Sequence, residues 1–167
     1  GVAATEVVYA MALDSTNGYI YVAGYDSSNN FRIEKRLATT GGLCTASACG
    51  AGDFDSDGVI DGVAATNSVR ALSLDVTNGY LYIVGDNSST NWRIEKRLAS
   101  TGALCTGVVC SAGSFDDDGV VDDVANSEVA YATSLDATNG YIYVAGYDSD
   151  LNLRLERRLT STGGLAL

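Results

Sequence analysis

The stretch Leu-Asp-Ser-Thr-Asn-Gly-Tyr-Ile-Tyr-Val at residues 13–22 decides the fold, because the chain contains it three times. It returns with conservative changes at residues 74–83 and 135–144. The asparagines Asn17, Asn78 and Asn139 set a period of 61 residues without a gap. Self-similarity at a fixed period of this size indicates a tandem array, in which each unit buries its apolar surface against its neighbours.

The period divides the chain into residues 1–61, residues 62–122 and a partial third unit at residues 123–167. Gly1 aligns with Gly62, so the chain begins and ends in the same inter-unit connection. We therefore expect the ends to join further copies head to tail, as a ring or a filament, in place of a stable isolated monomer.

Each unit predicts a short antiparallel meander. In the first unit, the apolar stretch at residues 7–13 predicts a strand, and the Asn-Gly turn supplies the positive φ angles of a tight hairpin. Residues 19–24 then fold back as a second strand, and residues 31–37, where apolar and charged side chains alternate, form a third. A fourth strand is expected around Leu43 or around residues 59–60. Without helical periodicity over any ten residues, the fold class is all-β.

The order of these features is similar to the blade repeats of bacterial secreted β-propellers of the SBBP and Delta-sixty kinds. The similarity rests on the Asn-Gly-Tyr-Ile-Tyr-Val-Ala-Gly-Tyr strand, the Arg-Ile-Glu-Lys-Arg strand and the Thr-Gly-Gly-Leu turn. It implies tandem antiparallel meander repeats that resemble propeller blades. The chain departs from that family by inserting two cysteines and an acidic loop between blades. Because a closed propeller needs four to eight blades, an open stack of β-repeats is the alternative.

The first acidic loop predicts a calcium site. Its carboxylates occupy alternate positions, and Gly58 permits the sharp turn that brings them to one point. The loop resembles thrombospondin-type and integrin-propeller calcium loops more than an EF-hand, because Ala64 stands where an EF-hand has its bidentate Glu. The predicted ligands are Asp53, Asp55, Asp57, the carbonyl of Val59, and Asp61. The alternative is an acidic surface loop whose carboxylates splay into water.

The second acidic loop repeats the pattern with a hydroxyl at its first position. A neutral hydroxyl is a weaker calcium ligand than a carboxylate, so we expect weaker binding here. The predicted ligands are Ser114, Asp116, Asp118, the carbonyl of Val120, and Asp122.

Two cysteine pairs share one spacing. Cys44 and Cys49 are separated by four residues, as are Cys105 and Cys110. We expect a local disulfide in each pair; a four-cysteine zinc site is the alternative, with the pairs a whole repeat apart. Disulfides imply an oxidising location, so the protein is expected to be secreted or on the cell surface.

The composition argues against several classes of function. The net charge of −11 argues against nucleic acid and anionic membrane as partners, and no apolar run approaches the ~20 residues that span a bilayer. The absence of His disfavours Ser–His and Cys–His triads, haem sites and His-containing zinc sites. We therefore expect no enzyme, although a fragment of a propeller enzyme remains a third class.

Two functions are favoured. The first is an extracellular, calcium-stabilised repeat protein with a structural role in a surface layer or filament-like assembly. The second is an adhesin or lectin-like propeller module that binds a glycan or surface protein. The tyrosine pair Tyr19 and Tyr21 with its repeats suits strand packing or a sugar-binding surface. Charged residues on the apolar sides of the strands predict repeated structural ion pairs, namely Lys35, Lys96 and Arg157 with Asp14, Asp75 and Asp136.

Overall fold

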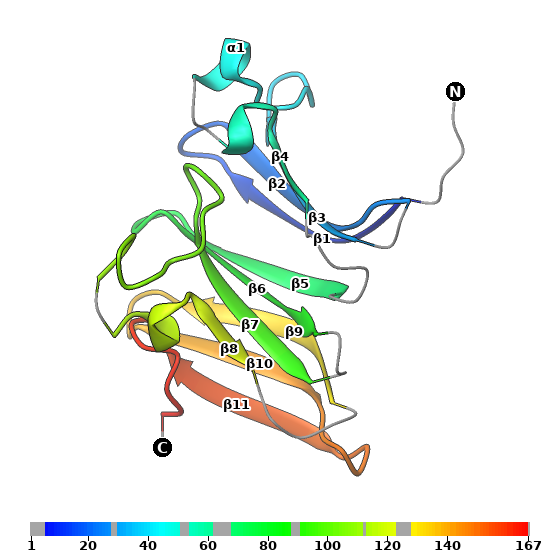
Figure 1. The fold of residues 1–167 in the computed structure, drawn as a ribbon, viewed down its shortest axis with the longest axis vertical. Helices are drawn as coiled ribbons and strands as arrows, with labels where there is room; N and C mark the ends of the chain where they lie inside the picture. Colours follow the sequence, from blue (N-terminus) through cyan, green and yellow to red (C-terminus); the bar gives the residue numbers. More distant parts are fainter. Residues whose placement is uncertain are drawn as a thin grey trace.

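The computed structural model describes residues 6–27, 30–50, 54–61, 68–87, 91–111, 113–122 and 128–166. Within them the chain forms three antiparallel sheets, stacked along the long axis of the molecule (Figure 1). The all-β prediction is confirmed.

The three sheets contain equivalent strands whose bounds are offset by the sequence period. Sheet 1 consists of β1 (Val7–Asp14), β2 (Tyr19–Tyr25), β3 (Phe31–Leu37) and β4 (Val59–Asp61). Sheet 2 consists of β5 (Ser68–Asp75), β6 (Tyr80–Asp86), β7 (Trp92–Leu98) and β8 (Val120–Asp122). Sheet 3 consists of β9 (Val129–Asp136), β10 (Tyr141–Tyr147) and β11 (Leu153–Leu159). The helical turns are α1 (Ala46–Cys49), η1 (Phe54–Ser56) and η2 (Phe115–Asp117).

The hairpin between the first two strands is confirmed, but its turn is longer than a two-residue turn. Asp14 pairs with Tyr19, which leaves a four-residue loop closed by a hydrogen bond of 2.8 Å from the Gly18 amide to the Asp14 carbonyl. The Asp14 carboxylate accepts the Asn17 amide at 2.9 Å, and of these loop residues only Gly18 has a positive φ, 78°. The wider turn is favoured because the aspartate side chain satisfies amides that the ladder leaves unpaired.

Both candidate positions for the fourth strand are used. Val59 pairs with Glu34 as part of β4, and Leu43 forms an isolated bridge with Arg36. The helical turns α1 and η1 lie between these two positions in the chain and outside the sheet (Figure 1).

The apolar core lies in two layers, one between each pair of neighbouring sheets. Between sheets 1 and 2, Tyr21, Ile33 and Phe54 meet Leu81 and Ile83. Sheet 2 uses its other face against sheet 3, where the fully buried side chains include Tyr82, Trp92, Ile94, Phe115, Ile142 and Val144. Among the described residues, sheet 2 is therefore covered on both faces, whereas sheets 1 and 3 are each covered on one face.

Candidate functional site

The described part of the first acidic loop is a tight left-handed turn. Phe54, Asp55 and Ser56 have positive φ values of 44°, 55° and 68°, and the Phe54 ring is fully buried. Gly58 packs so closely on the disulfide loop that a Cβ there would lie 2.7 Å from the Cys44 amide nitrogen. The loop conformation is therefore set by an aromatic anchor and a glycine contact.

The predicted calcium ligands of this loop are partly engaged by the protein itself. The Asp57 carboxylate accepts the Val59 amide at 2.8 Å, and Asp61 lies 3.3 Å from the Arg32 guanidinium. Burial and the nearby carboxylates raise the pKa of Asp61 despite Arg32. Asp55 points to solvent, and Asp53 lies outside the described residues.

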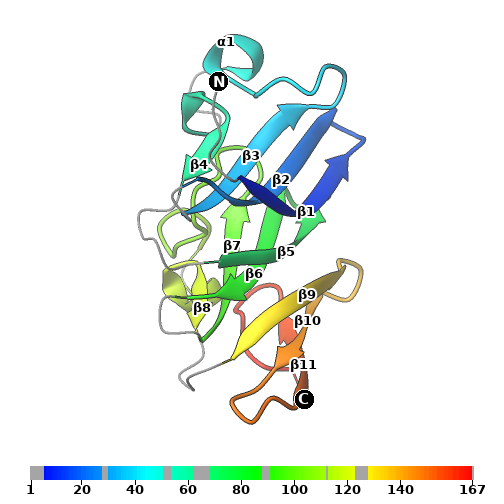
Figure 2. The same cartoon turned by 90° about the vertical axis from the view of Figure 1, so that its right-hand side faces the viewer.

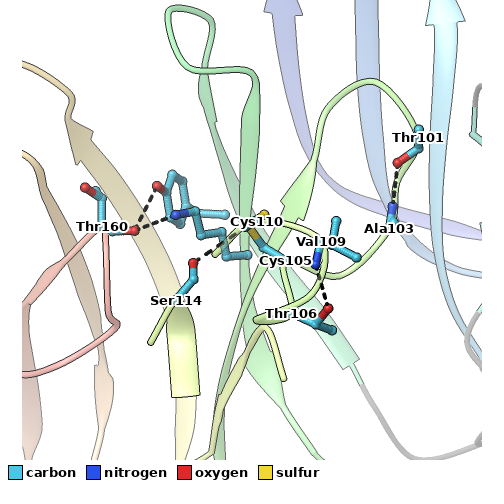
Figure 3. The surroundings of a disulfide bond; sticks show 10 residues. Thr101, Ala103, Cys105, Thr106, Val109, Cys110, Ser114 and Thr160 are labelled. Atoms are coloured by element: carbon cyan, nitrogen blue, oxygen red, sulfur yellow. Dashed lines mark hydrogen bonds between the residues drawn. A yellow bond between two sulfur atoms is a disulfide. The ribbon is translucent and has the colours of Figure 1, made fainter. Parts of the chain in front are cut away.

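The second loop has the same conformation. Asp118 accepts the Val120 amide at 2.8 Å, Asp122 lies 2.8 Å from Arg93, and Asp116 is exposed. Ser114 is buried, with its hydroxyl 3.9 Å from the Cys105 sulfur (Figure 3). Among the described residues of both loops, no three acidic, His or Cys side chains come together as a metal-binding group. Calcium at either loop stays a prediction.

The disulfides are confirmed. Cys44 bonds Cys49 and Cys105 bonds Cys110, so neither pair contributes to a zinc site. Cys44 and Cys105 are fully buried, and their amides donate to the carbonyls of Lys35 and Lys96 on the third strands. Each bridge thus anchors its loop to the sheet, and the two disulfides indicate an oxidising environment.

Polar contacts between the sheets recur once per repeat. The Tyr21 hydroxyl donates to the Ala99 carbonyl of the next sheet at 2.8 Å. One repeat later, the carbonyl of Thr160 accepts both the Tyr82 hydroxyl, at 3.4 Å, and the Lys96 ammonium, at 2.9 Å (Figure 3). Tyr21 and Tyr82 therefore serve as packing residues, which confirms the structural interpretation at the second position of the first two pairs.

The groove between the first hairpins of sheets 1 and 2 has a volume of about 390 Å³. The Lys35 ammonium lies 4.1 Å from the centre of the Tyr19 ring and 3.5 Å from the Ser100 carbonyl. Asp14 and Asp75, which also line the groove, are buried. In the next repeat, burial lowers the pKa of Lys96 and the charge of Asp75 opposes that shift. The Lys96 ammonium donates to the Thr160 carbonyl, and the predicted lysine–aspartate ion pair stays a prediction.

A different surface breaks the repeat symmetry. In each sheet the first strand has a β-bulge, whose extra residue is Tyr9, Arg70 or Tyr131. The opposing strand carries a glycine there because a Cβ would lie within 2 Å of the bulged strand's carbonyl, as at Gly24 and Val7 (1.8 Å). A β-bulge changes the direction in which a side chain points, and β-bulges are over-represented next to functional sites.

These three bulge residues form one column. The guanidinium carbon of Arg70 lies 5.2 Å from the centre of the Tyr9 ring and 5.7 Å from that of Tyr131. Figure 2 looks onto this side of the stack, where β1, β5 and β9 lie one above another. We name Tyr9, Arg70 and Tyr131, with their cross-strand partners Tyr25, Asp86 and Tyr147, the bulge column.

The cross-strand partners change together with the bulge residues. Tyr9 packs on Tyr25 with ring centres 5.6 Å apart, and a hydrogen bond with Tyr9 raises the pKa of Tyr25. Sheet 3 has the same tyrosine pair. In sheet 2 the pair is Arg70 and Asp86, joined at 3.3 Å. Sequence reasoning missed this surface, although alignment of the three units shows the paired change, and Arg70 is the one basic residue outside the third strands.

Comparison with known proteins assigns no family, since neither a protein-family model nor a curated protein sequence matches the chain. Among the described residues, no helix has the length and apolarity to cross a membrane.

Proposed function

We propose that this protein is an extracellular repeat protein with a structural role, in a surface layer or a filament-like assembly, whose units act as blade-like elements that join further copies at both ends. The observation that carries the proposal is that each outer face of the stack presents apolar side chains at positions that are buried between the sheets.

The outer face of sheet 1 is one of these surfaces. Met11 is 69% exposed, and its equivalent in sheet 2, Leu72, is 9% exposed. Val8 is 64% exposed, whereas its equivalent Val69 is 3% exposed. Leu13 is also exposed. The same residue positions therefore form an interface between sheets 1 and 2 and an exposed surface on sheet 1.

The outer face of sheet 3 is the other surface. Leu153 and Leu155 are 86% and 64% exposed, while their equivalents in sheet 2, Trp92 and Ile94, are buried. Tyr143 occupies the position from which Tyr21 and Tyr82 reach the next sheet.

The outer face of sheet 1 is complementary to the outer face of sheet 3, and neither face is complementary to itself. Inside the chain, the face equivalent to that of sheet 3 always packs on the face equivalent to that of sheet 1. A contact between copies that repeats this geometry is head to tail, which generates a ring or an open filament. Burying an exposed valine, leucine or methionine contributes about 1.5–3 kcal/mol, so the five such side chains on the two faces favour association substantially.

The proposal also includes an extracellular location and the binding of calcium. The disulfides suit secretion or display on the cell surface, where millimolar calcium is available to acidic loops. Catalysis is not part of the proposal, as expected from a sequence without His and with three similar units.

Light scattering tests the assembly. We expect the protein to associate in the micromolar range, and Met11→Glu or Leu155→Glu to weaken association at least about tenfold, because each buries a charge in the contact. Val108→Glu is the matched control, since Val108 is 98% exposed on the disulfide loop, away from both end faces. A wild-type protein that stays monomeric throughout this range contradicts the proposal.

The adhesin or lectin-like module is the second candidate. The bulge column favours it, because this surface is the place where one unit differs in chemistry from the other two.

A further inference from the structure

The bulge column contains chemistry that the fold does not need. Sheets 1 and 3 build the same bulge with a tyrosine pair, so Arg70 and Asp86 are not required to form it. Nine of the ten basic residues of the chain lie in the third strands, and the tenth, Arg70, lies at the centre of this surface. The change of both partners together preserves the cross-strand contact while it replaces two hydroxyphenyl rings by an ion pair.

The column is accessible at its three bulge residues, whereas Asp86 is 8% exposed. Tyr9 and Tyr131 are 42% and 51% exposed, and the Arg70 side chain retains 26% of its surface. The two tyrosines flank the guanidinium within cation–π distance, which limits the freedom of all three side chains. Tyrosine offers a large amphipathic contact area at a low cost in conformational entropy, so a preordered tyrosine surface is well suited to binding.

The combination of groups identifies the class of ligand. The exposed parts of the Tyr9 and Tyr131 rings can contact apolar C–H surfaces, while the arginine donates hydrogen bonds and the aspartate accepts them. Asp86 neutralises Arg70, and the protein carries a net charge of −11, so an anionic ligand gains little here. Apolar faces bordered by many hydroxyl groups are the chemistry of a neutral sugar.

We propose that the bulge column binds an uncharged oligosaccharide, with sugar rings against Tyr9 and Tyr131 and hydroxyl groups hydrogen-bonded to the Arg70–Asp86 pair. This site lies on the bulged first strands and does not rest on the proposed assembly. It would let the protein hold a glycan whether its end faces are covered or free.

Saturation-transfer NMR tests the site, since it works for monomers and for larger assemblies. The probes are cellohexaose, maltohexaose and N-acetylchitohexaose, each at about 1 mM, the weak end of specific affinity. The key variant is R70Y/D86Y, which gives sheet 2 the tyrosine pair already used by sheets 1 and 3. We expect it to fold with an unchanged circular dichroism spectrum and to bind at least about tenfold more weakly.

Further variants make the result decisive. Tyr131→Ala should lower the affinity at least about fivefold, and Val108→Ala should leave it unchanged. Absence of transfer to all three sugars overturns the proposal, as does wild-type affinity in both R70Y/D86Y and Tyr131→Ala. Binding of a lysine-rich peptide at the column without binding of any sugar also overturns it, in favour of a protein partner.

Discussion

A glycine-to-alanine pair measures how strongly one sheet packs on the next. Gly41 and Gly102 occupy equivalent turns after the third strand, with φ values of 74° and 75°. A Cβ at Gly41 meets nothing within 4 Å. A Cβ at Gly102 would lie 2.6 Å from the Ile60 Cγ1 and 3.2 Å from the Phe54 ring of the neighbouring unit.

The two substitutions share one cost and differ in another. Alanine in the left-handed region costs about 1–2 kcal/mol at either position. At Gly102 the new methyl group must also displace Ile60 against the buried Phe54, and overpacking of this kind costs a further 1–3 kcal/mol or so. We therefore expect Gly102→Ala to lower the free energy of unfolding by about 1–3 kcal/mol more than Gly41→Ala does.

Thermal unfolding followed by far-ultraviolet circular dichroism provides the assay. For a chain of this length the extra cost corresponds to a melting temperature roughly 2–4 °C lower per kcal/mol. Both variants are made in the Leu155→Glu background, so that association does not cover Gly41. Gly163→Ala should behave like Gly102→Ala, because its Cβ would lie 2.6 Å from Val121. Equal destabilisation by Gly41→Ala and Gly102→Ala would refute the packing described between sheets 1 and 2.

Three further predictions concern the disulfides, the buried carboxylate and the calcium loops. Replacing Cys44 and Cys49 by alanine should cost about 2 kcal/mol through lost loop-closure entropy, and a reducing agent should lower the melting temperature of the wild type but not of a variant lacking all four cysteines. Burial opposes ionisation of Glu95, but the charges of Arg97 and Arg93 outweigh burial and hold the pKa of Glu95 below its usual value. The ionised Glu95 therefore contributes its full stabilisation of the folded state above about pH 4.3, and this stabilisation is lost as the pH falls through the lower pKa of the folded state. Urea midpoints should consequently fall more steeply on acidification for the wild type than for Glu95→Gln, and parallel curves would show that this ion pair contributes nothing. Calcium should raise the melting temperature, and Asp55→Asn should reduce that rise while having no effect when a chelator is present. Asp57→Ala should instead lower the free energy of unfolding by about 1 kcal/mol both with calcium and with chelator, because it removes the hydrogen bond to the Val59 amide. Calorimetry that detects no calcium uptake would exclude the sites.

Local patterns predicted the individual strands well. Asp14 and Gly18 specify a hairpin through contacts within five residues of chain, so the sequence indicates it directly. The cysteine spacing likewise predicted the bridge Cys44–Cys49.

The role of the second tyrosine in a pair could not be predicted from local sequence. Tyr21 was open to packing or to sugar binding, and only its hydrogen bond to Ala99, in the next sheet, settles its role. The choice between Leu43 and Val59 as the fourth-strand residue had the same difficulty, since the edge of β3 has room to pair with both at different points.

The sequence by itself determined the period, which a comparison of the three units reveals directly. It also determined the order of strands in each unit, the disulfide pairs and the all-β class, because these depend on residues close together in the chain. Only the tertiary structure decided which faces are covered and which residues from different units meet. Arg70 is 61 residues from both Tyr9 and Tyr131, and it contacts both because neighbouring sheets stack with their bulged first strands side by side. Such contacts depend on the packing of whole sheets, for which no short stretch of sequence carries a signal.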